Sequence, residues 1–376
     1  MLVKKRLVVG VAVIFLFWLL LSLRQPQNIS FRSSKIPPAL NSACKLEEKS
    51  ASSCDERTGK HTIPNIVHYV YLLPRSSDDL QFQFSHFLSV YSAYYYWNPN
   101  EIYLHTNADS ASLARAKSGS SGKWSSLLLT LPVLVVNEVK VPTHAENGKE
   151  IQNIEHKSDF VRVQAVYDYG GIYIDMDVFP LRDIKDLRER GYSAVAGRQH
   201  AGELNSGTFM SIKGGRVMKR WMERMTRVYD GQWTTHSNIA LTHVAERREE
   251  GCDMLILHQD AFAPGSWESE DVSLLFHTHE EGTRLFGLAS RLGWTPKWAH
   301  DWSCTYLLHA FHPRKERHGF KHNDITPSFV LAQRSNFGRA VYPVAKSLYD
   351  QGLIGFQDTD LGLEALGEIT LNGFRT

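Results

Sequence analysis

Two carboxylates separated by a single residue, Asp175 and Asp177, follow a Gly-Gly pair inside a run of apolar residues. Because side chains alternate across a β-strand, a strand over residues 172–179 would place both carboxylates on one face. Two like charges side by side on a hydrophobic strand are costly unless a cation neutralises them. Oxygen ligands suit Mg²⁺ or Mn²⁺ better than zinc, so the segment predicts a divalent-metal site able to hold a diphosphate.

The competing interpretation is that Asp175 and Asp177 only cap the end of a strand and face water. The surrounding sequence favours a functional site, because a helix-like segment and the Gly-Gly turn precede the pair and Phe179-Pro180 follows it. Ligands of α/β proteins usually bind outside the carboxyl ends of strands. We therefore expect a ligand to bind at this position.

The segment before the Gly-Gly turn, residues 153–169, has the pattern of a helix and carries two further polar side chains. Asp159 and Arg162 stand three residues apart, so they share one face of that helix. They could form a surface salt bridge of little consequence. Alternatively, Asp159 binds sugar hydroxyls while Arg162 presents its rigid donor fork to hydroxyl or phosphate oxygens.

These side chains need elements that bring them together, and the chain alternates strand and helix patterns. The expected strands are residues 63–72, 101–106, 133–136, 172–179, 194–196 and 206–211, and the expected helices are 79–97, 110–117, 153–169 and 217–229. Asp78 or Asp79 is expected to cap the first helix. Strands that alternate with helices predict an α/β fold with a mostly parallel sheet flanked by helices.

The N-terminus has the pattern of a membrane anchor. Basic residues at 4–6 precede a predominantly apolar run at 7–23. The length of this run is at the lower limit of the ~17–25 residues needed to cross a bilayer. No small-residue cleavage site follows, so we expect an uncleaved transmembrane signal anchor, with a cleaved secretory signal as the alternative. The basic residues favour a cytosolic N-terminus and a lumenal remainder, and a short span suits the Golgi or ER membrane.

Composition divides the chain into five expected regions. These are a cytosolic tail at 1–6, the transmembrane anchor at 7–23, a flexible stem at 24–60, a catalytic domain at 61–320, and a C-terminal extension at 321–376 packed on that domain or trailing it. The formal net charge of the 376 residues is only +2, so nothing favours a nucleic-acid partner.

Four cysteines would meet the oxidising lumen and can pair in three ways. We prefer Cys44 with Cys54 and Cys252 with Cys304, because each of these pairs lies within one region of the chain. Free buried thiols are the alternative for the second pair.

Two motifs resemble those of the DXD-containing glycosyltransferases of family 32. The letters IPNIVH at 63–68 are similar to the family's opening strand, and KSDFVR at 157–162 with YDYGGIYIDMD at 167–177 is similar to its sugar-binding region. Related proteins are the α-1,4-galactosyltransferases, the α-1,6-mannosyltransferases and the inositolphosphoceramide mannosyltransferases. The resemblance implies a GT-A fold related to the Rossmann fold, a UDP-hexose or GDP-mannose donor, a glycan or glycolipid acceptor, Mn²⁺ (or Mg²⁺), and retention of anomeric configuration.

The resemblance also implies roles for single residues. By motif position, Asp159 and Arg162 would contact the donor sugar, Tyr173 the nucleotide or sugar, Asp175 and Asp177 the metal, ribose and diphosphate, and Tyr71 the base. A late strand, LLHAFH at 307–312, is similar to one that carries a histidine in the family, so His309 or His312 would complete the metal or diphosphate site. Residues 205–207 are candidates for the acceptor side.

Several mechanisms fit this pattern. A front-face displacement, in which the departing phosphate helps to deprotonate the acceptor, needs no protein nucleophile, whereas Asp159 or Asp168 would act as nucleophile or base in the alternative. The metal and Arg162 would stabilise charge on the diphosphate. Two other classes of protein remain as rivals, namely a glycan hydrolase with paired carboxylates and an inactive lumenal lectin or scaffold.

Overall fold

The computed structural model describes residue 44 and residues 61–247, 253–279 and 297–362. The expected tail at 1–6, anchor at 7–23 and nearly all of the stem at 24–60 lie outside these ranges. Within the described ranges, no helix combines the length and the apolar character that crossing a membrane requires.

The central sheet has seven strands in the order β3-β2-β1-β4-β7-β6-β8. They are β1 (Ile66–Val70), β2 (Glu101–Thr106), β3 (Leu134–Glu138), β4 (Gly171–Ile174), β6 (Ala194–Arg198), β7 (Leu204–Ser211) and β8 (Met254–Leu257). Strand β7 pairs antiparallel with β4 and β6, while the other neighbours pair in parallel. The expected α/β fold with a mostly parallel sheet is therefore confirmed. A separate antiparallel pair joins β5 (Val178–Pro180) to β9 (Leu307–His309).

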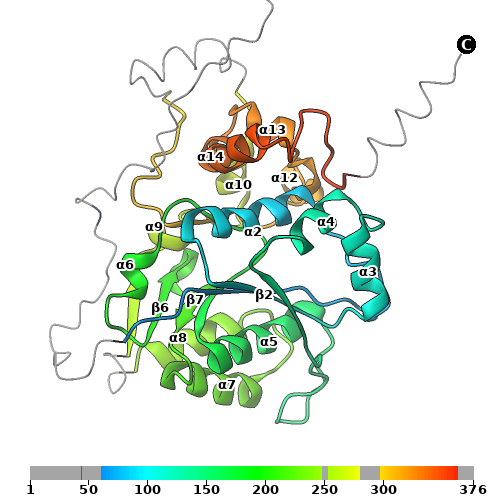
Figure 1. Cartoon of the computed structure of the whole chain (residues 1–376). Coiled ribbons are helices and arrows are strands. Elements are labelled where there is room, and N and C mark those ends of the chain that lie inside the picture. Colours follow the sequence, from blue (N-terminus) through cyan, green and yellow to red (C-terminus); the bar gives the residue numbers. More distant parts are fainter. Residues whose placement is uncertain (1–43, 45–60, 248–252, 280–296, 363–376) are drawn as a thin grey trace, which may run out of the picture. The chain divides into compact units, whose positions relative to one another are not determined.

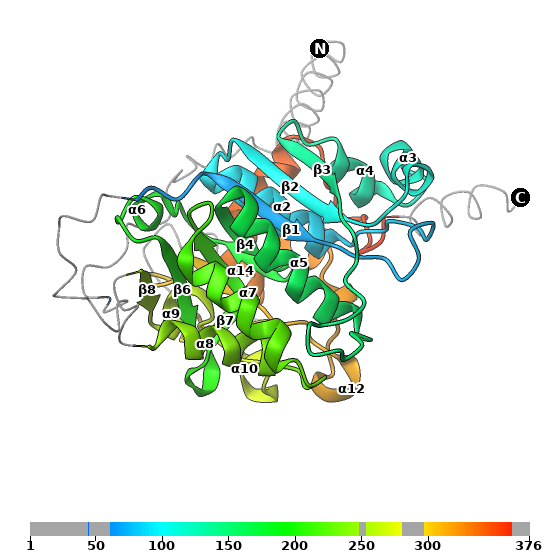
Figure 2. The ribbon, with the colours of Figure 1, turned by 90° about the horizontal axis from the view of Figure 1, so that it is seen from below.

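Helices cover both faces of the sheet (Figures 1 and 2). On one face lie α2 (Phe84–Trp97), α4 (Lys123–Leu129) and α14 (Asn336–Asp350), and on the other α5 (Ile154–Tyr169), α7 (Arg216–Val228) and α8 (Ala240–Ala245). Strand β4 shows the alternation clearly, because Ile172 and Ile174 belong to the first core and Tyr173 to the second. The other helices are α3 (Ser110–Ser118), α6 (Lys185–Arg188), η1 (His200–Gly202), η2 (Thr235–Ile239), α9 (Gln259–Phe262), α10 (Ser269–Phe276), α12 (Lys315–His318), η5 (His322–Asp324) and α13 (Pro327–Leu331).

The predicted carboxylate strand over 172–179 is wrong in one respect. Strand β4 ends at Ile174, and the chain turns before β5 begins at Val178. The amide of Asp175 still donates to Gly207 O (2.9 Å), but the amide of Val178 donates back to Asp175 O (3.1 Å) and closes a turn. The two carboxylates therefore follow the strand instead of sharing one of its faces.

The first helix begins later than expected, at Phe84. Asp78 does not cap it, because its carboxylate accepts hydrogen bonds from the amide and the Nε of Arg75 and so forms a local turn. Leu80 and Phe82 are fully buried in the extended segment that follows. The helix predicted over 153–169 is confirmed as α5.

The described part of the C-terminal extension packs on the rest of the structure. Phe337, Val341 and Val344 of α14 lie in the same core as α2, and Phe337 meets Phe179 of β5 with 4.9 Å between ring centroids. Residues 363–376 lie outside the described ranges.

A disulfide joins Cys44 to Cys304, with Cα atoms 5.6 Å apart across a sequence separation of 260 residues. Both preferred pairings, Cys44–Cys54 and Cys252–Cys304, are therefore wrong. The expectation relied on closeness in sequence, whereas pairing depends on Cα separation in the folded chain. Cys54 and Cys252 lie outside the described residues.

Candidate active site

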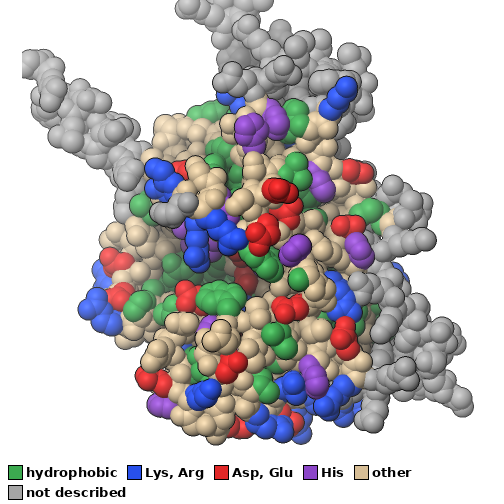
Figure 3. All heavy atoms as spheres, turned by 180° about the vertical axis from the view of Figure 1, so that it is seen from behind, with side chains coloured by type: hydrophobic (Ala, Val, Ile, Leu, Met, Phe, Trp, Pro, Cys, Tyr) green, Lys and Arg blue, Asp and Glu red, His purple; other side chains and the backbone are tan. Residues whose placement is uncertain are grey.

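The candidate site lies where three strands of the sheet meet at one edge. Tyr71 follows the carboxyl end of β1, Asp175 follows that of β4, and the antiparallel β7 begins beside them with residues 205–207. The chain order reverses between β1 and β4, which is where ligands bind in open α/β sheets. A cavity of about 620 Å³ lies here. Figure 3 shows a hollowed face of the molecule with basic and hydrophobic side chains around the opening.

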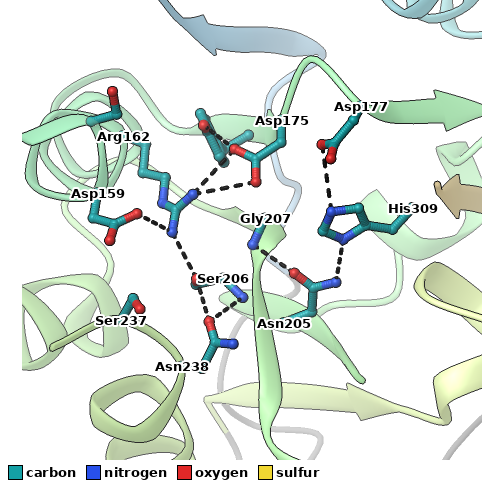
Figure 4. Close-up of polar contacts among 12 residues, drawn as sticks. Asp159, Arg162, Asp175, Asp177, Asn205, Ser206, Gly207, Ser237, Asn238 and His309 are labelled. Carbon is teal, nitrogen blue, oxygen red and sulfur yellow. Dashed lines mark hydrogen bonds and ion pairs between the residues drawn. The ribbon is translucent and has the colours of Figure 1, made fainter. Parts of the chain in front are cut away.

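Arg162 is the centre of the polar network in this cavity (Figure 4). From α5 its guanidinium reaches Asp175 (Nη1 to Oδ1, 3.1 Å) and Ser206 (Nη2 to Oγ, 2.7 Å), and it forms a close ion pair with Asp159. Arg162 is only 6% exposed. Burial by itself would lower the pKa of Arg162, but Asp159 and Asp175 raise it above its ordinary value. The predicted pair on α5 is thus a buried ion pair and not a surface salt bridge.

Asp159 has a partner on each carboxylate oxygen. Oδ1 contacts Arg162, and Oδ2 lies 2.7 Å from His236 Nε2. His236 is fully buried in η2, a π-helical turn, where its ring stacks on Phe160 with 5.6 Å between centroids. Sequence reasoning missed His236, because nothing in the sequence connects residues 77 positions apart.

Tyr173 holds Asp175 in place. Its hydroxyl donates a close hydrogen bond to Asp175 Oδ1, and its ring lies 5.2 Å from the Arg162 guanidinium carbon. Burial raises the pKa of Asp175, while Arg162 acts in the opposite direction. Burial likewise raises the pKa of Tyr173, so its hydroxyl remains a donor. The predicted contact of Tyr173 with nucleotide or sugar stays a prediction.

Asp177 faces two histidines. His309 Nε2 lies 3.5 Å from Asp177 Oδ1, and His312 Nδ1 lies 3.8 Å from Oδ2. Burial would raise the pKa of Asp177, but these histidines lower it below its usual range. Ligand atoms of Asp175, Asp177 and His309 all lie within 4.8 Å of one another, so this set fits a divalent cation. Of the two predicted histidines, His309 thus belongs to this group of candidate metal ligands, whereas the half-exposed His312 does not.

The first residues of β7 support these groups. Asn205 Oδ1 accepts from the Gly207 amide (2.6 Å), which turns its Nδ2 toward His309 Nδ1 (2.7 Å). With the amide in this orientation a neutral His309 carries its proton on Nε2. Binding a metal through Nε2 requires the proton on Nδ1 instead, and the Asn205 amide turned over would accept that proton. A Cβ at Gly207 would lie 2.5 Å from Asp175 Oδ2, so only glycine leaves room for the carboxylate. Contact of residues 205–207 with an acceptor stays a prediction.

Tyr71 lines the same cavity at the end of β1. Its hydroxyl donates to Gln81 O (3.1 Å), and its ring packs against Phe82 with 4.7 Å between centroids. An aromatic face is therefore held at the cavity wall. Binding of a base to Tyr71 stays a prediction.

Asp168, considered as a nucleophile, does not reach the site. Its two oxygens accept from Gln164 Nε2 (2.9 Å each), and both residues line a second cavity of about 330 Å³. The alternative that used Asp168 is therefore wrong, since residues nine apart on a helix lie on opposite faces.

Comparison with known proteins agrees with this geometry. Residues 84–194 match a family model described as the glycosyltransferase sugar-binding region containing DXD motif. The match spans α2 to the start of β6 and includes Asp159, Arg162, Asp175 and Asp177. Glucan organizing enzyme 1 of Cryptococcus neoformans var. grubii is 23% identical over 245 residues, which cover 62% of this chain and 62% of that protein.

Solved structures with distant similarity are also glycosyltransferases by name. GlyE of Streptococcus pneumoniae TIGR4 has a TM-score of 0.41 at 11% identity, over 77% of this chain and 64% of that one. The WbbM bifunctional enzyme has a TM-score of 0.43 at 12% identity, over 79% and 52%. Residues 84–194, which carry Asp159, Arg162, Asp175 and Asp177, are therefore similar to the sugar-binding region of the DXD-containing glycosyltransferases.

Proposed function

We propose that this chain is a metal-assisted, retaining hexosyltransferase with a GT-A fold. It would move a hexose from a UDP-hexose or GDP-mannose donor to a glycan or glycolipid acceptor. The observation that carries the proposal is the meeting of Asp159 and Arg162 from α5 with Asp175, Asp177 and His309 in one cavity. The strand order, in which only β7 is antiparallel in the central sheet, supports the fold assignment.

Asp175, Asp177 and His309 would hold the metal, with Mn²⁺ or Mg²⁺ as the fitting ions. Such an ion supplies a positive charge that neutralises a leaving diphosphate. His312 lies close enough to Asp177 to add a hydrogen-bond donor toward the same phosphates.

Arg162 and Asp159 would bind and orient the donor sugar. The buried guanidinium is held by three oxygen-bearing side chains and so keeps a fixed position beside the bond that breaks. Both oxygens of Asp159 have partners, which argues against Asp159 as a covalent nucleophile and favours front-face displacement. Trapping a glycosyl adduct on Asp159 would contradict this mechanism.

We further propose a lumenal location in the Golgi or ER, with residues 7–23 as a type II anchor. The anchor pattern carries this part of the proposal, and the Cys44–Cys304 disulfide supports an oxidising compartment. Protease protection of the chain in sealed microsomes would test it, since full digestion without detergent is incompatible with a lumenal domain.

The decisive experiment supplies the full chain with Mn²⁺ and a panel of nucleotide sugars, and measures donor hydrolysis and transfer. Glucan oligosaccharides join the acceptor panel because the name of the fungal relative refers to glucan. We expect Asp177→Ala to lower turnover about 10³-fold, whereas Asp168→Ala, outside the cavity, serves as the matched control. A folded Asp177→Ala variant with full turnover would refute the metal assignment.

The same experiment separates the rival functions. Cleavage of glycans without any nucleotide sugar would identify a hydrolase with paired carboxylates. Donor binding without turnover in the wild type would identify an inactive lectin or scaffold.

A further inference from the structure

An exposed tryptophan, Trp233, lines the cavity of the candidate site. Trp233 is 60% exposed, the largest value among the exposed large hydrophobic side chains in the described ranges. Among that same set, Trp233 alone lines the site cavity. An aromatic side chain left open to water at a cavity wall is a candidate ligand contact.

The position of Trp233 is fixed by its surroundings. Its carbonyl accepts from Ser237 Oγ (3.3 Å), and its ring lies 5.4 Å from that of the buried His156 at an interplanar angle of 59°. The preceding segment is tied down by Asp230, which accepts from the Gln232 amide (2.9 Å) and from Thr235 Oγ1 (3.1 Å). The ring is therefore presented on a supported turn and loses little freedom when a ligand binds.

Polar residues line the same cavity as the ring. They include Glu155 and Ser158 of α5 and Thr234, which follows Trp233 in the sequence. An acyl chain would have to desolvate the Glu155 carboxylate without replacing its hydrogen bonds, which is costly. A sugar ring offers an apolar C–H face to the indole and hydroxyls to the carboxylate, so it matches both features.

The rise along α5 from Glu155 to Asp159 is close to the spacing of two adjacent sugar rings. Glu155 precedes Asp159 by four residues, which is one helical turn and about 6 Å of rise. His236, which contacts Asp159 Oδ2, follows Trp233 by three residues, so one short segment serves both positions. A ring that hydrogen-bonds to Glu155 would therefore lie about one sugar length from a ring held by Asp159 and Arg162.

We propose that Trp233 and Glu155 form the acceptor subsite and that it binds a pyranose ring. This inference rests on the proposed function, because it takes the Asp159 and Arg162 end of the cavity as the donor-sugar position. Trp233 would stack on the ring and Glu155 would accept hydrogen bonds from its hydroxyls.

The test uses the full chain in a detergent without a sugar headgroup, with Mn²⁺ and the donor that the wild type hydrolyses. The acceptor probes are methyl glycosides of glucose, galactose and mannose and glucan oligosaccharides, with octanol as the lipid-like probe. The variants are Trp233→Ala, Trp233→Phe and the control Phe356→Ala, which removes an aromatic that is 57% exposed outside the cavity.

We expect Trp233→Ala to raise the acceptor KM and lower the ratio of transfer to hydrolysis about tenfold, which corresponds to about 1.4 kcal/mol. Trp233→Phe should fall between this variant and the wild type, and Phe356→Ala should match the wild type. An unchanged acceptor KM in Trp233→Ala would overturn the subsite. The subsite would also be overturned if octanol competed with the sugar acceptor in the wild type and this competition disappeared in Trp233→Ala. That result would identify a lipid-binding surface.

A wild type that hydrolyses no donor contradicts the proposed function and not the sugar subsite. Saturation-transfer NMR with the methyl glycosides then decides the subsite alone. Contacts that depend on Trp233 support it, and their absence from the wild type refutes it.

Discussion

One helix, α5, borders two cavities that differ in chemistry. Asp159 and Arg162 face the larger one, where the carboxylate is buried and contacted by a guanidinium and an imidazole. Asp168 and Gln164 face the smaller one, where the carboxylate is exposed and, among the described residues, accepts hydrogen bonds from a neutral amide. Converging buried charges in a cavity are typical of a ligand site, so we expect the larger cavity to bind the ligand. An exposed carboxylate beside an amide is typical of an ordinary helix surface.

The smaller cavity lies beside a buried histidine pair that ties strands together. His68 Nε2 lies 2.8 Å from Gly170 O, and since a carbonyl only accepts, His68 donates there. His68 Nδ1 then accepts from His105 Nε2 (2.9 Å), whose Nδ1 accepts from Asn137 Nδ2 (2.9 Å). This series of hydrogen bonds holds the Gly-Gly turn that precedes the site carboxylates. We therefore expect the histidine pair to contribute to stability and the larger cavity to contribute to activity.

Removing the guanidinium should have the largest effect. Arg162→Ala leaves Asp159 and Asp175 buried without their partner, so we expect transfer to fall about 10³-fold, or about 4 kcal/mol. Arg162→Lys should recover part of the loss, because it keeps the charge and loses the fork. Steady-state kinetics of transfer measures these losses, with Gln164→Ala as the control. An equal loss of transfer in Gln164→Ala would show that the two cavities do not differ in function.

Acid should destabilise the protein through the histidine pair. Burial lowers the pKa of His68 from 6.5 to about 4 and that of His105 to about 3. As the pH falls below 6.5, these histidines take up protons in the unfolded chain before they do so in the folded protein. The free energy of unfolding, which is at its full value above pH 6.5, therefore decreases until the pH reaches the pKa of each histidine in the folded protein. Between pH 6.5 and pH 4.5 the loss is on the order of 3 kcal/mol per histidine.

Urea unfolding at pH 7 and pH 4.5 measures this loss. The double variant His68→Asn with His105→Asn should be less stable at pH 7 and show a shallower decline toward acid. A decline as steep as in the wild type would assign the acid sensitivity to other groups.

A methyl group at Gly207 should have an intermediate effect. The added Cβ would collide with Asp175 Oδ2 and approach His309 Cε1 to 2.9 Å, so the carboxylate must shift. We expect Gly207→Ala to lower transfer about tenfold, because small displacements of catalytic groups are costly. Gly265→Ala, where the nearest atom is 3.8 Å away, is the matched control.

The smallest effect is expected at the smaller cavity. Asp168→Asn keeps the shape and removes a charge whose hydrogen-bond partner within the described ranges is Gln164, so transfer should stay within about twofold of the wild type. A loss beyond tenfold would show that the two cavities are not functionally distinct.

Much of the site followed from local patterns. The spacing of Asp159 and Arg162 on one helix face and the pair Asp175 and Asp177 after a buried strand are properties of short segments, so periodicity reveals them. The same periodicity excludes Asp168, since nine residues on a helix correspond to two and a half turns. The end of β4 at Ile174 did not follow, because a turn closed by one backbone hydrogen bond leaves little trace in composition.

The sequence by itself determined the alternation of strands and helices, the candidate carboxylates and the membrane-anchor pattern, because these depend on residues close along the chain. Only the tertiary structure decided that His236 holds Asp159, that Gly207 leaves room for Asp175, and that Cys44 pairs with Cys304. These contacts join segments far apart in sequence, and such contacts are set by how the sheet and helices pack and not by any local pattern.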